Sequence, residues 1–162
     1  MHKINKYFLK AGILAEKNGK LLLIKEKNVS NGKFYWNIIK GTFDPRIDKS
    51  ILQTAIRECK EETNFKVKIK GVSGIMLLKR KNGITLQINL LATILNKNLS
   101  SVKNAKNIPV KDEEISEIRF FTKKELMRLK KSKLMNQRTF LAISGWLKGE
   151  KYTLSLLKEL TG

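Results

Sequence analysis

The sequence predicts a mixed α/β fold of the α+β type, in which helices flank a mixed β-sheet and a helical extension follows at the C-terminus. Strand-like apolar runs occur in both halves of the chain, an amphipathic helix pattern separates them, and further helix patterns follow the last strand. With 162 residues, 41% of them hydrophobic, the chain suits one domain. We expect residues 1–162 to form it, with a core at about 8–130 and a helical tail at about 131–162.

The first expected element is a β-hairpin over residues 8–25, because Asn18-Gly19 is a favoured turn dipeptide between two apolar-rich runs. A further strand is expected over residues 34–39. Its aromatic side chains could stack a base, but a buried Trp36 is the commoner outcome. A loop containing Asp44-Pro45 follows.

A helix is expected from Ile51 to about Thr63, since Ser50 is a favoured N-cap residue and Gln53 stands where a capping-box partner would. Four residues at i, i+3, i+4 and i+7 form the stripe expected to face the core: Leu52, Ala55, Ile56 and Cys59. Cys59 is therefore expected to be a core residue and not a nucleophile.

The second half of the chain predicts another hairpin, a short strand and more helices. The hairpin covers residues 67–95 around Asn82-Gly83, and a polar loop expected to be mobile covers residues 96–107. The remaining predicted elements are a strand over residues 118–121, a helix from about Lys123 with Thr122 as cap and Glu125 in its capping box, and one or two helices over residues 134–160, broken near Gly149.

Composition excludes several classes of site. Cys59 is the one cysteine and His2 the one histidine, so a Cys/His zinc site and a histidine-based catalytic triad are excluded. No apolar run is long enough to span a membrane, and the N-terminal residues show no cleavage signature, so we expect a cytoplasmic protein. The net charge of +20 favours a polyanionic partner such as RNA, or equally a compositional bias towards lysine.

The acidic residues are concentrated in two windows. Nine of the 14 lie within residues 44–62 and 112–117 of a chain that is otherwise rich in lysine. Glu58, Glu61 and Glu62 share one helix face at i, i+3 and i+4, where like charges repel unless a cation lies among them. Mg²⁺ prefers such carboxylate oxygens. The alternative is a solvated face whose charges are balanced by Arg57 and Lys60.

The segment Arg57-Glu58-Cys59-Lys60-Glu61-Glu62-Thr63-Asn64, with Gly41 upstream, resembles the Nudix box G-x5-E-x7-R-E-U-x-E-E-x-G-U, in which U is apolar. The R-E-U-x-E-E part is complete. The opening hairpin and the ending at residues 113–122 are also similar to those of Nudix domains, so the resemblance covers most of residues 8–130.

The sequence departs from this pattern in three places. Fifteen residues separate Gly41 from Arg57 instead of thirteen, which is a two-residue insertion. Lys49 stands where the first box glutamate is expected, with Asp48 beside it as a candidate substitute. Asn64 replaces the last glycine, a mild change because asparagine also tolerates the left-handed C-cap conformation.

The resemblance implies Mg²⁺-dependent hydrolysis, with Mn²⁺ as another candidate metal, of the pyrophosphate bond in a nucleoside diphosphate linked to another group. It implies that Glu58, Glu61 and Glu62 hold the metal, with a backbone carbonyl near Gly41 as a further ligand. Arg57 would orient a box glutamate, and Glu58 is a candidate base. Glu114 is the candidate base or extra ligand from the second acidic window.

Two alternatives to hydrolysis of a small nucleotide remain open at this point. One keeps the chemistry and takes an RNA 5′ end as the substrate, supported by the net charge of +20. The other is a Nudix-fold binding module that no longer cleaves, supported by Lys49. No membrane partner is expected.

Overall fold

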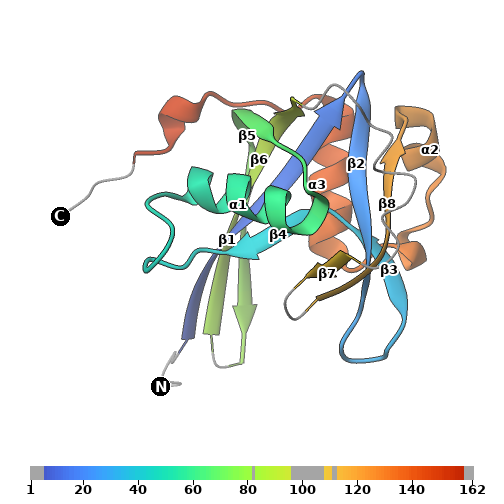
Figure 1. Ribbon diagram of the computed structural model, residues 1–162, viewed down its shortest axis with the longest axis horizontal. Helices are drawn as coiled ribbons and strands as arrows, with labels where there is room; N and C mark the ends of the chain where they lie inside the picture. The colour runs from blue at the N-terminus through green and yellow to red at the C-terminus, as the bar shows by residue number, and fades with distance from the viewer. Residues whose placement is uncertain (1–5, 82, 96–107, 111–112, 159–162) are drawn as a thin grey trace.

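A mixed β-sheet lies between helices in the computed structural model, which describes residues 6–81, 83–95, 108–110 and 113–158 (Figure 1). In the described part the sheet has eight strands: β1 (Lys6–Lys17), β2 (Lys20–Lys27), β3 (Phe34–Asn37), β4 (Ile39–Thr42), β5 (Val67–Arg80), β6 (Gly83–Ile94), β7 (Ile108–Val110) and β8 (Glu113–Phe121). The α-helices are α1 (Ile51–Thr63), α2 (Lys123–Arg128) and α3 (Gln137–Lys148), and 3-10 turns cover Lys131–Lys133 and Leu154–Leu156. The predicted α+β class with a mixed sheet is confirmed.

The sheet divides between its two central strands. Its order is β5-β6-β1-β2-β8-β7, with β1 parallel to β6 and the other neighbours antiparallel. The predicted turn Asn18-Gly19 has φ of 52° and 70°, the positive values that a type I′ hairpin turn needs. Beyond the two residue pairs next to this turn, β1 and β2 part, and β4 pairs with β1 while β3 pairs with β2.

Each face of the sheet carries its own hydrophobic core. Figure 1 shows α1 in front of the sheet and α3 behind it. The core under α1 includes Ile13, Ile24, Ile39, Ala55 and Cys59. The core under α3 includes Leu14, Leu23, Trp36, Ile143 and Trp146. Successive strand residues supply opposite cores because side chains alternate across a strand.

The predicted ends of α1 are confirmed, with one difference in the cap. The Ser50 side chain accepts a hydrogen bond from the Gln53 backbone N–H, as an N-cap residue does. The Gln53 side chain accepts from the backbone N–H of Lys49 at 2.7 Å, one residue before the capping-box position. At the other end, Asn64 adopts the left-handed conformation with φ of 59°.

The buried face of α1 is rotated relative to the predicted stripe. Ile56 was expected in the core, but its side chain is 44% exposed. The buried residues of α1 include a row at intervals of four, four and three positions: Ile51, Ala55, Cys59 and Glu62. Ile51 begins the helix and is fully buried, so it sets which face of the helix meets the sheet.

Two predicted strands have different bounds in the structure. The strand predicted over residues 34–39 is interrupted at Ile38, whose backbone N–H donates to the Asn37 side chain at 3.0 Å. The strand predicted over residues 118–121 begins earlier, at Glu113, so the acidic segment is extended and does not lead directly into a helix. The turn residue Asn82, the predicted loop over residues 96–107 and the acidic residue Asp112 lie outside the described residues.

The C-terminal tail is part of the second core. Ala142, Ile143 and Trp146 of α3 are buried against the sheet. The predicted break near Gly149 is confirmed by its φ of 75°, but residues 150–158 form no further α-helix, and Tyr152 instead makes a β-bridge with Val72. Among the described residues, no helix has the length and apolar character needed to cross a membrane.

Asn64 provides a test of the C-cap. Replacing it with glycine should keep or slightly raise the free energy of unfolding, because glycine adopts positive φ without steric cost. Asn64→Ala should lower it by about 1 kcal/mol, because a Cβ is disfavoured in this conformation. Both variants lose the hydrogen bond that the Lys60 amine donates to the Asn64 side chain, so urea denaturation of the pair isolates the backbone effect. Equal stability of the two variants would contradict it.

Candidate active site

Glu58 of α1 packs against Gly41 of the sheet. A Cβ atom built on Gly41 would lie 1.9 Å from Cδ and 2.0 Å from Oε1 of Glu58, so only glycine leaves room for this carboxylate. Gly41 lies in β4, and Ala11 of β1 is its partner in the sheet. The structure thus places Glu58, a predicted metal ligand, against Gly41, whose neighbourhood is predicted to supply a backbone carbonyl ligand.

Arg57 is anchored by Asp48. Its Nε donates to Oδ1 of Asp48 at 2.9 Å and its NH2 group donates to Oδ2 at 2.8 Å, a two-pronged ion pair. The Asp48 side chain is fully buried, and it also accepts hydrogen bonds from the Thr54 hydroxyl at 3.0 Å and from the Asp44 backbone N–H at 3.1 Å. Asp48, the candidate substitute for the first box glutamate, is thus buried against Arg57, while the side chain of the neighbouring Lys49 is exposed.

The remaining guanidinium nitrogen of Arg57 joins two more box carboxylates. NH1 donates to Oε1 of Glu58 at 2.7 Å and to Oε2 of Glu61 at 3.1 Å. Arg57 thus contacts the carboxylates of Asp48, Glu58 and Glu61. We call these four residues the Arg57 cluster. The hydrogen bonds from Arg57 lower the pKa of Asp48, and those that Asp48 accepts are the main reason why the pKa of Arg57 is raised.

The three helix glutamates have different environments. The Glu58 side chain is 14% exposed and that of Glu61 is 51% exposed, whereas Glu62 is buried at 1%. Among the described residues, no three histidine, cysteine or acidic side chains are grouped so that they could hold a metal ion in the conformations present. The chemistry of the donors still suits a hard cation, because Glu58 and Glu61 converge on NH1 of Arg57, whose NH2 group donates to the backbone carbonyl of Thr42 in β4 at 3.4 Å.

A cavity of about 510 Å³ is lined in part by Lys40, the residue before Gly41. Glu26 in its wall is buried, and it accepts hydrogen bonds from the Lys40 amine at 2.9 and 3.0 Å and from the Asn37 side chain at 2.7 Å. The Thr139 hydroxyl of α3 donates in turn to Oδ1 of the Asn37 side chain. The sequence pattern does not predict this network, and the one local signal for it is the polar residue Asn37 inside an apolar strand.

Glu114 lies on the wall of this cavity and not in the Arg57 cluster. Its carboxylate is 61% exposed and forms an ion pair with the Lys27 amine at 2.8 Å. Cys59, by contrast, is fully buried, and burial raises the pKa of its thiol to about 12, which agrees with the predicted core role.

Comparison with known proteins identifies the class to which this fold belongs. The sequence-family model of the NUDIX domain matches residues 7–142 of this chain. The chain therefore belongs to the NUDIX family of pyrophosphohydrolases. No curated protein matches the sequence.

Solved structures show the same fold at low sequence identity. A NUDIX hydrolase from Nitrosomonas europaea superimposes with a TM-score of 0.76 at 20% identity, covering 96% of this chain and 98% of that one. An ADP compounds hydrolase gives 0.66 at 19% identity, covering 88% and 74%. An ADP-ribose pyrophosphatase from Streptococcus suis gives 0.62 at 19% identity, covering 90% and 92%.

The buried ion pair between Asp48 and Arg57 gives a prediction for stability. Asp48→Asn should lower the free energy of unfolding by about 3 kcal/mol, the low end for breaking a buried pair, because Arg57 keeps its contacts with Glu58 and Glu61. Asp44→Asn is the matched control. It removes the carboxylate of an ion pair with Arg46, whose side chain is 85% exposed, and should change stability little.

The same pair predicts a pH dependence. Because the pKa of Asp48 is lower in the folded state, the stabilisation is present above the unfolded pKa of about 3.9 and is lost as pH falls through the folded value. The difference in urea midpoint between the parent and Asp48→Asn should therefore be constant from pH 5 to 7 and shrink below about pH 4. A difference that persists unchanged to pH 2 would show that the carboxylate charge is not responsible.

Proposed function

We propose that this protein is a Mg²⁺-dependent hydrolase that cleaves the pyrophosphate bond of a nucleoside diphosphate linked to another group. The observation that carries the proposal is the Glu58 carboxylate, which lies against Gly41 while Arg57 holds its charge. A carboxylate kept beside a backbone segment by a charge-assisted hydrogen bond is in a defined position before any substrate arrives. Its geometry therefore suits water activation or metal coordination.

The negative charge of the Arg57 cluster supports a role in cation binding. Three carboxylates surround one guanidinium, so the cluster keeps an excess of negative charge although the chain carries +20 overall. Glu58, Glu61 and Glu62, with a carbonyl near Gly41, would hold the metal. When bound, Mg²⁺ would neutralise charge on the pyrophosphate and so lower the barrier to attack by water.

The cavity beside Lys40 is a suitable place for the substrate. It is about 510 Å³, within the usual range for sites that take small molecules, and it borders the segment that leads to Gly41. Lys27 and Lys40 line its wall as ion pairs with Glu114 and Glu26, and Asn28 and Asn136 contribute amide groups. Since solved relatives include an ADP compounds hydrolase and an ADP-ribose pyrophosphatase, nucleoside diphosphate sugars are the first substrates to test.

Glu61→Gln should abolish hydrolysis and leave the fold intact. It removes a hard anionic ligand, so the rate should fall at least about 100-fold on any substrate the parent cleaves. The free energy of unfolding without metal should change by less than about 0.5 kcal/mol, because a half-exposed ion pair adds little. The measurement is phosphate release, with a coupled phosphatase for nucleoside diphosphate sugars and a coupled inorganic pyrophosphatase for nucleoside triphosphates and 5′-triphosphorylated RNA.

Glu117→Gln is the control for this variant. The Glu117 side chain is 45% exposed and its carboxylate pairs with Lys25 at 3.6 Å. The substitution and the exposure therefore match those of Glu61→Gln, but Glu117 lies outside the Arg57 cluster. Millimolar Mg²⁺ should raise the melting temperature of the parent and of Glu117→Gln, but not that of Glu61→Gln. A parent that cleaves no substrate and melts at the same temperature with and without Mg²⁺ would favour the binding module instead.

Lys49→Glu tests whether the altered box position limits catalysis. Asp48 already forms the two-pronged contact with Arg57, and the Lys49 side chain is exposed. Restoring a glutamate at residue 49 should therefore change the rate constant of hydrolysis by less than about twofold, since exposed substitutions away from such contacts have small effects. A clear rise in rate would show that Asp48 does not substitute for the box glutamate.

A further inference from the structure

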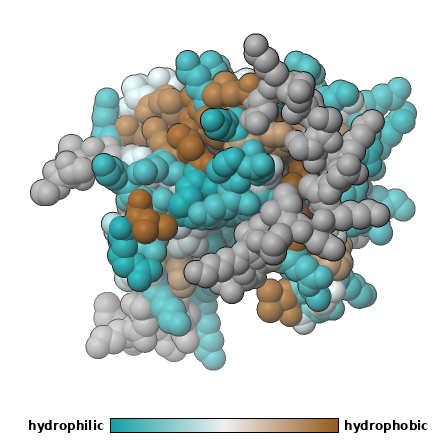
Figure 2. Space-filling model, in the orientation of Figure 1, coloured by the Kyte–Doolittle hydropathy of each residue, from teal (hydrophilic) through white to brown (hydrophobic). Residues whose placement is uncertain are grey.

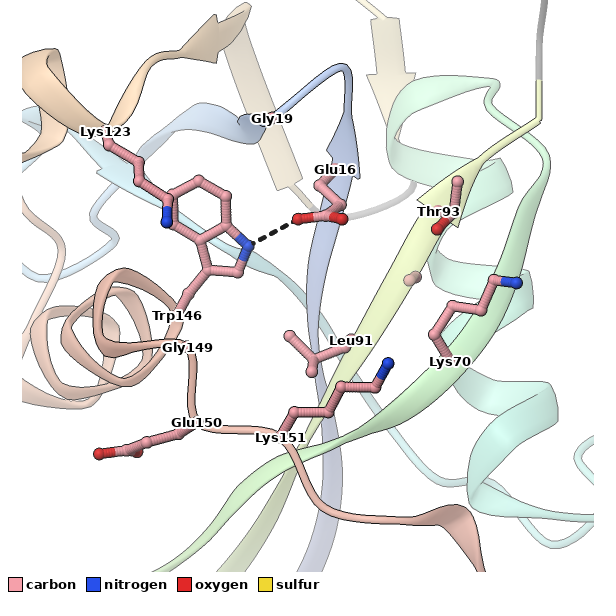
Figure 3. A pocket seen from close by; sticks show the side chains of 11 residues that line it. Glu16, Gly19, Lys70, Leu91, Thr93, Lys123, Trp146, Gly149, Glu150 and Lys151 are labelled. Atoms are coloured by element: carbon pink, nitrogen blue, oxygen red, sulfur yellow. Dashed lines mark hydrogen bonds between the residues drawn. The ribbon is translucent and has the colours of Figure 1, made fainter.

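A second cavity, of about 480 Å³, lies on the face of the sheet that α3 covers (Figure 3). Glu16 at the end of β1, Leu91 of β6, Trp146 of α3 and Lys151 after α3 all line it. This place is remote from the Arg57 cluster. Gly41 pairs with Ala11, and Glu16 is five residues further along β1, about 16 Å at 3.3 Å per residue.

Lysine side chains from three separate elements line this cavity. Figure 3 shows the Lys151 amine beside Leu91 and the Lys123 amine beside the Trp146 ring, and the Lys123 amine is 5.6 Å from the ring centroid. Lys70 of β5 lines the opposite side, and the Glu150 carboxylate points away. No carboxylate in the described part of the chain forms an ion pair with any of these three lysines.

Glu16 supplies the one carboxylate that faces into the cavity. Its Oε2 accepts a hydrogen bond from the indole N–H of Trp146 at 3.0 Å, which fixes both side chains (Figure 3). Its other oxygen can accept from a donor on a ligand. The cavity therefore combines lysine amines for an anionic group, a carboxylate acceptor for a hydroxyl group, and apolar surface from Leu91.

We propose that this cavity binds an organic phosphate of about the size of a mononucleotide. The phosphate contacts the amine of Lys151, a ligand hydroxyl donates to Glu16, and the remainder covers Leu91, while Lys70 and Lys123 add positive charge on either side of the cavity. Lysine is a common phosphate ligand, and a volume of about 480 Å³ is in the range of small-molecule sites. The net charge of +20 attracts such anions to the surface. A sugar phosphate, a mononucleotide and the end of an RNA strand share this chemistry.

The two tryptophans allow a site-specific test by NMR. Trp146 lines the cavity, whereas Trp36 lies in β3 and packs edge-on against Phe121 with ring centroids 4.8 Å apart. Without divalent metal, titration with AMP or ribose 5-phosphate should shift the indole N–H resonance of Trp146 and leave that of Trp36 in place. Adenosine, which lacks the phosphate, should shift neither. The readout does not involve hydrolysis, so its failure is distinct from failure of the proposed function.

Lysine variants establish which residues bind. Lys151→Ala should weaken AMP binding by about tenfold, as loss of a charge-assisted contact does, and Lys151→Arg should retain it. Lys79→Ala is the matched control, since it removes an equal charge from an exposed position near the other end of β5. No shift of Trp146 with any phosphate, or equal weakening by Lys79→Ala, would overturn the proposal.

A 5′-phosphorylated single-stranded RNA distinguishes the sources of the phosphate. If the site takes an RNA end, this RNA should shift the Trp146 resonance at lower concentration than AMP does and show the steeper salt dependence of several released counterions. If the site takes a small molecule, AMP and ribose 5-phosphate should bind at least as tightly as the RNA. Both results support a phosphate site. RNA binding that leaves the Trp146 resonance in place, while AMP shifts it, would assign the site to a small molecule. If neither ligand shifts the Trp146 resonance, the proposal is overturned.

Discussion

The guanidinium of Arg57 is the interaction on which the candidate active site depends. It contacts Asp48, Glu58 and Glu61 at once, and without it these like charges would repel one another at the start and on one face of α1. Asp48 is buried and holds one edge of the guanidinium, so the other edge points at the box glutamates. In Figure 2 the surface over α1 is largely hydrophilic.

The sheet provides the other half of this arrangement. Because β1 and β2 part beyond their turn, β4 can pair with β1 and bring Gly41 beneath α1. Gly41 has no Cβ, so Glu58 can approach the backbone closely. Because side chains alternate along a strand, the Lys40 side chain lies on the face of β4 opposite to Gly41. There it pairs with Glu26 and lines the cavity proposed for the substrate. A single short strand thus links the acidic cluster with the proposed substrate site.

The two cavities differ in how their charges are balanced. In the cavity beside Lys40, the amine of Lys40 is paired with Glu26 and that of Lys27 with Glu114. In the cavity beside Trp146, the lysines have no ion-pair partner among the described residues, and Glu16 is bound to the indole. The first arrangement suits a site whose shape is set before binding, while the second leaves charge available to an incoming anion.

The sequence by itself determined the features that depend on neighbours within one or two turns of chain. These are the Asn18-Gly19 turn, the caps of α1 and the spacing that places the three box glutamates on adjoining turns of this helix, all of which follow from local backbone geometry. The tertiary structure alone decided that Ile56 is exposed, that Glu62 is buried and that Asp48 holds Arg57. These outcomes depend on which face of α1 meets the sheet and on how the loop before it folds back, and both are set by packing between distant segments.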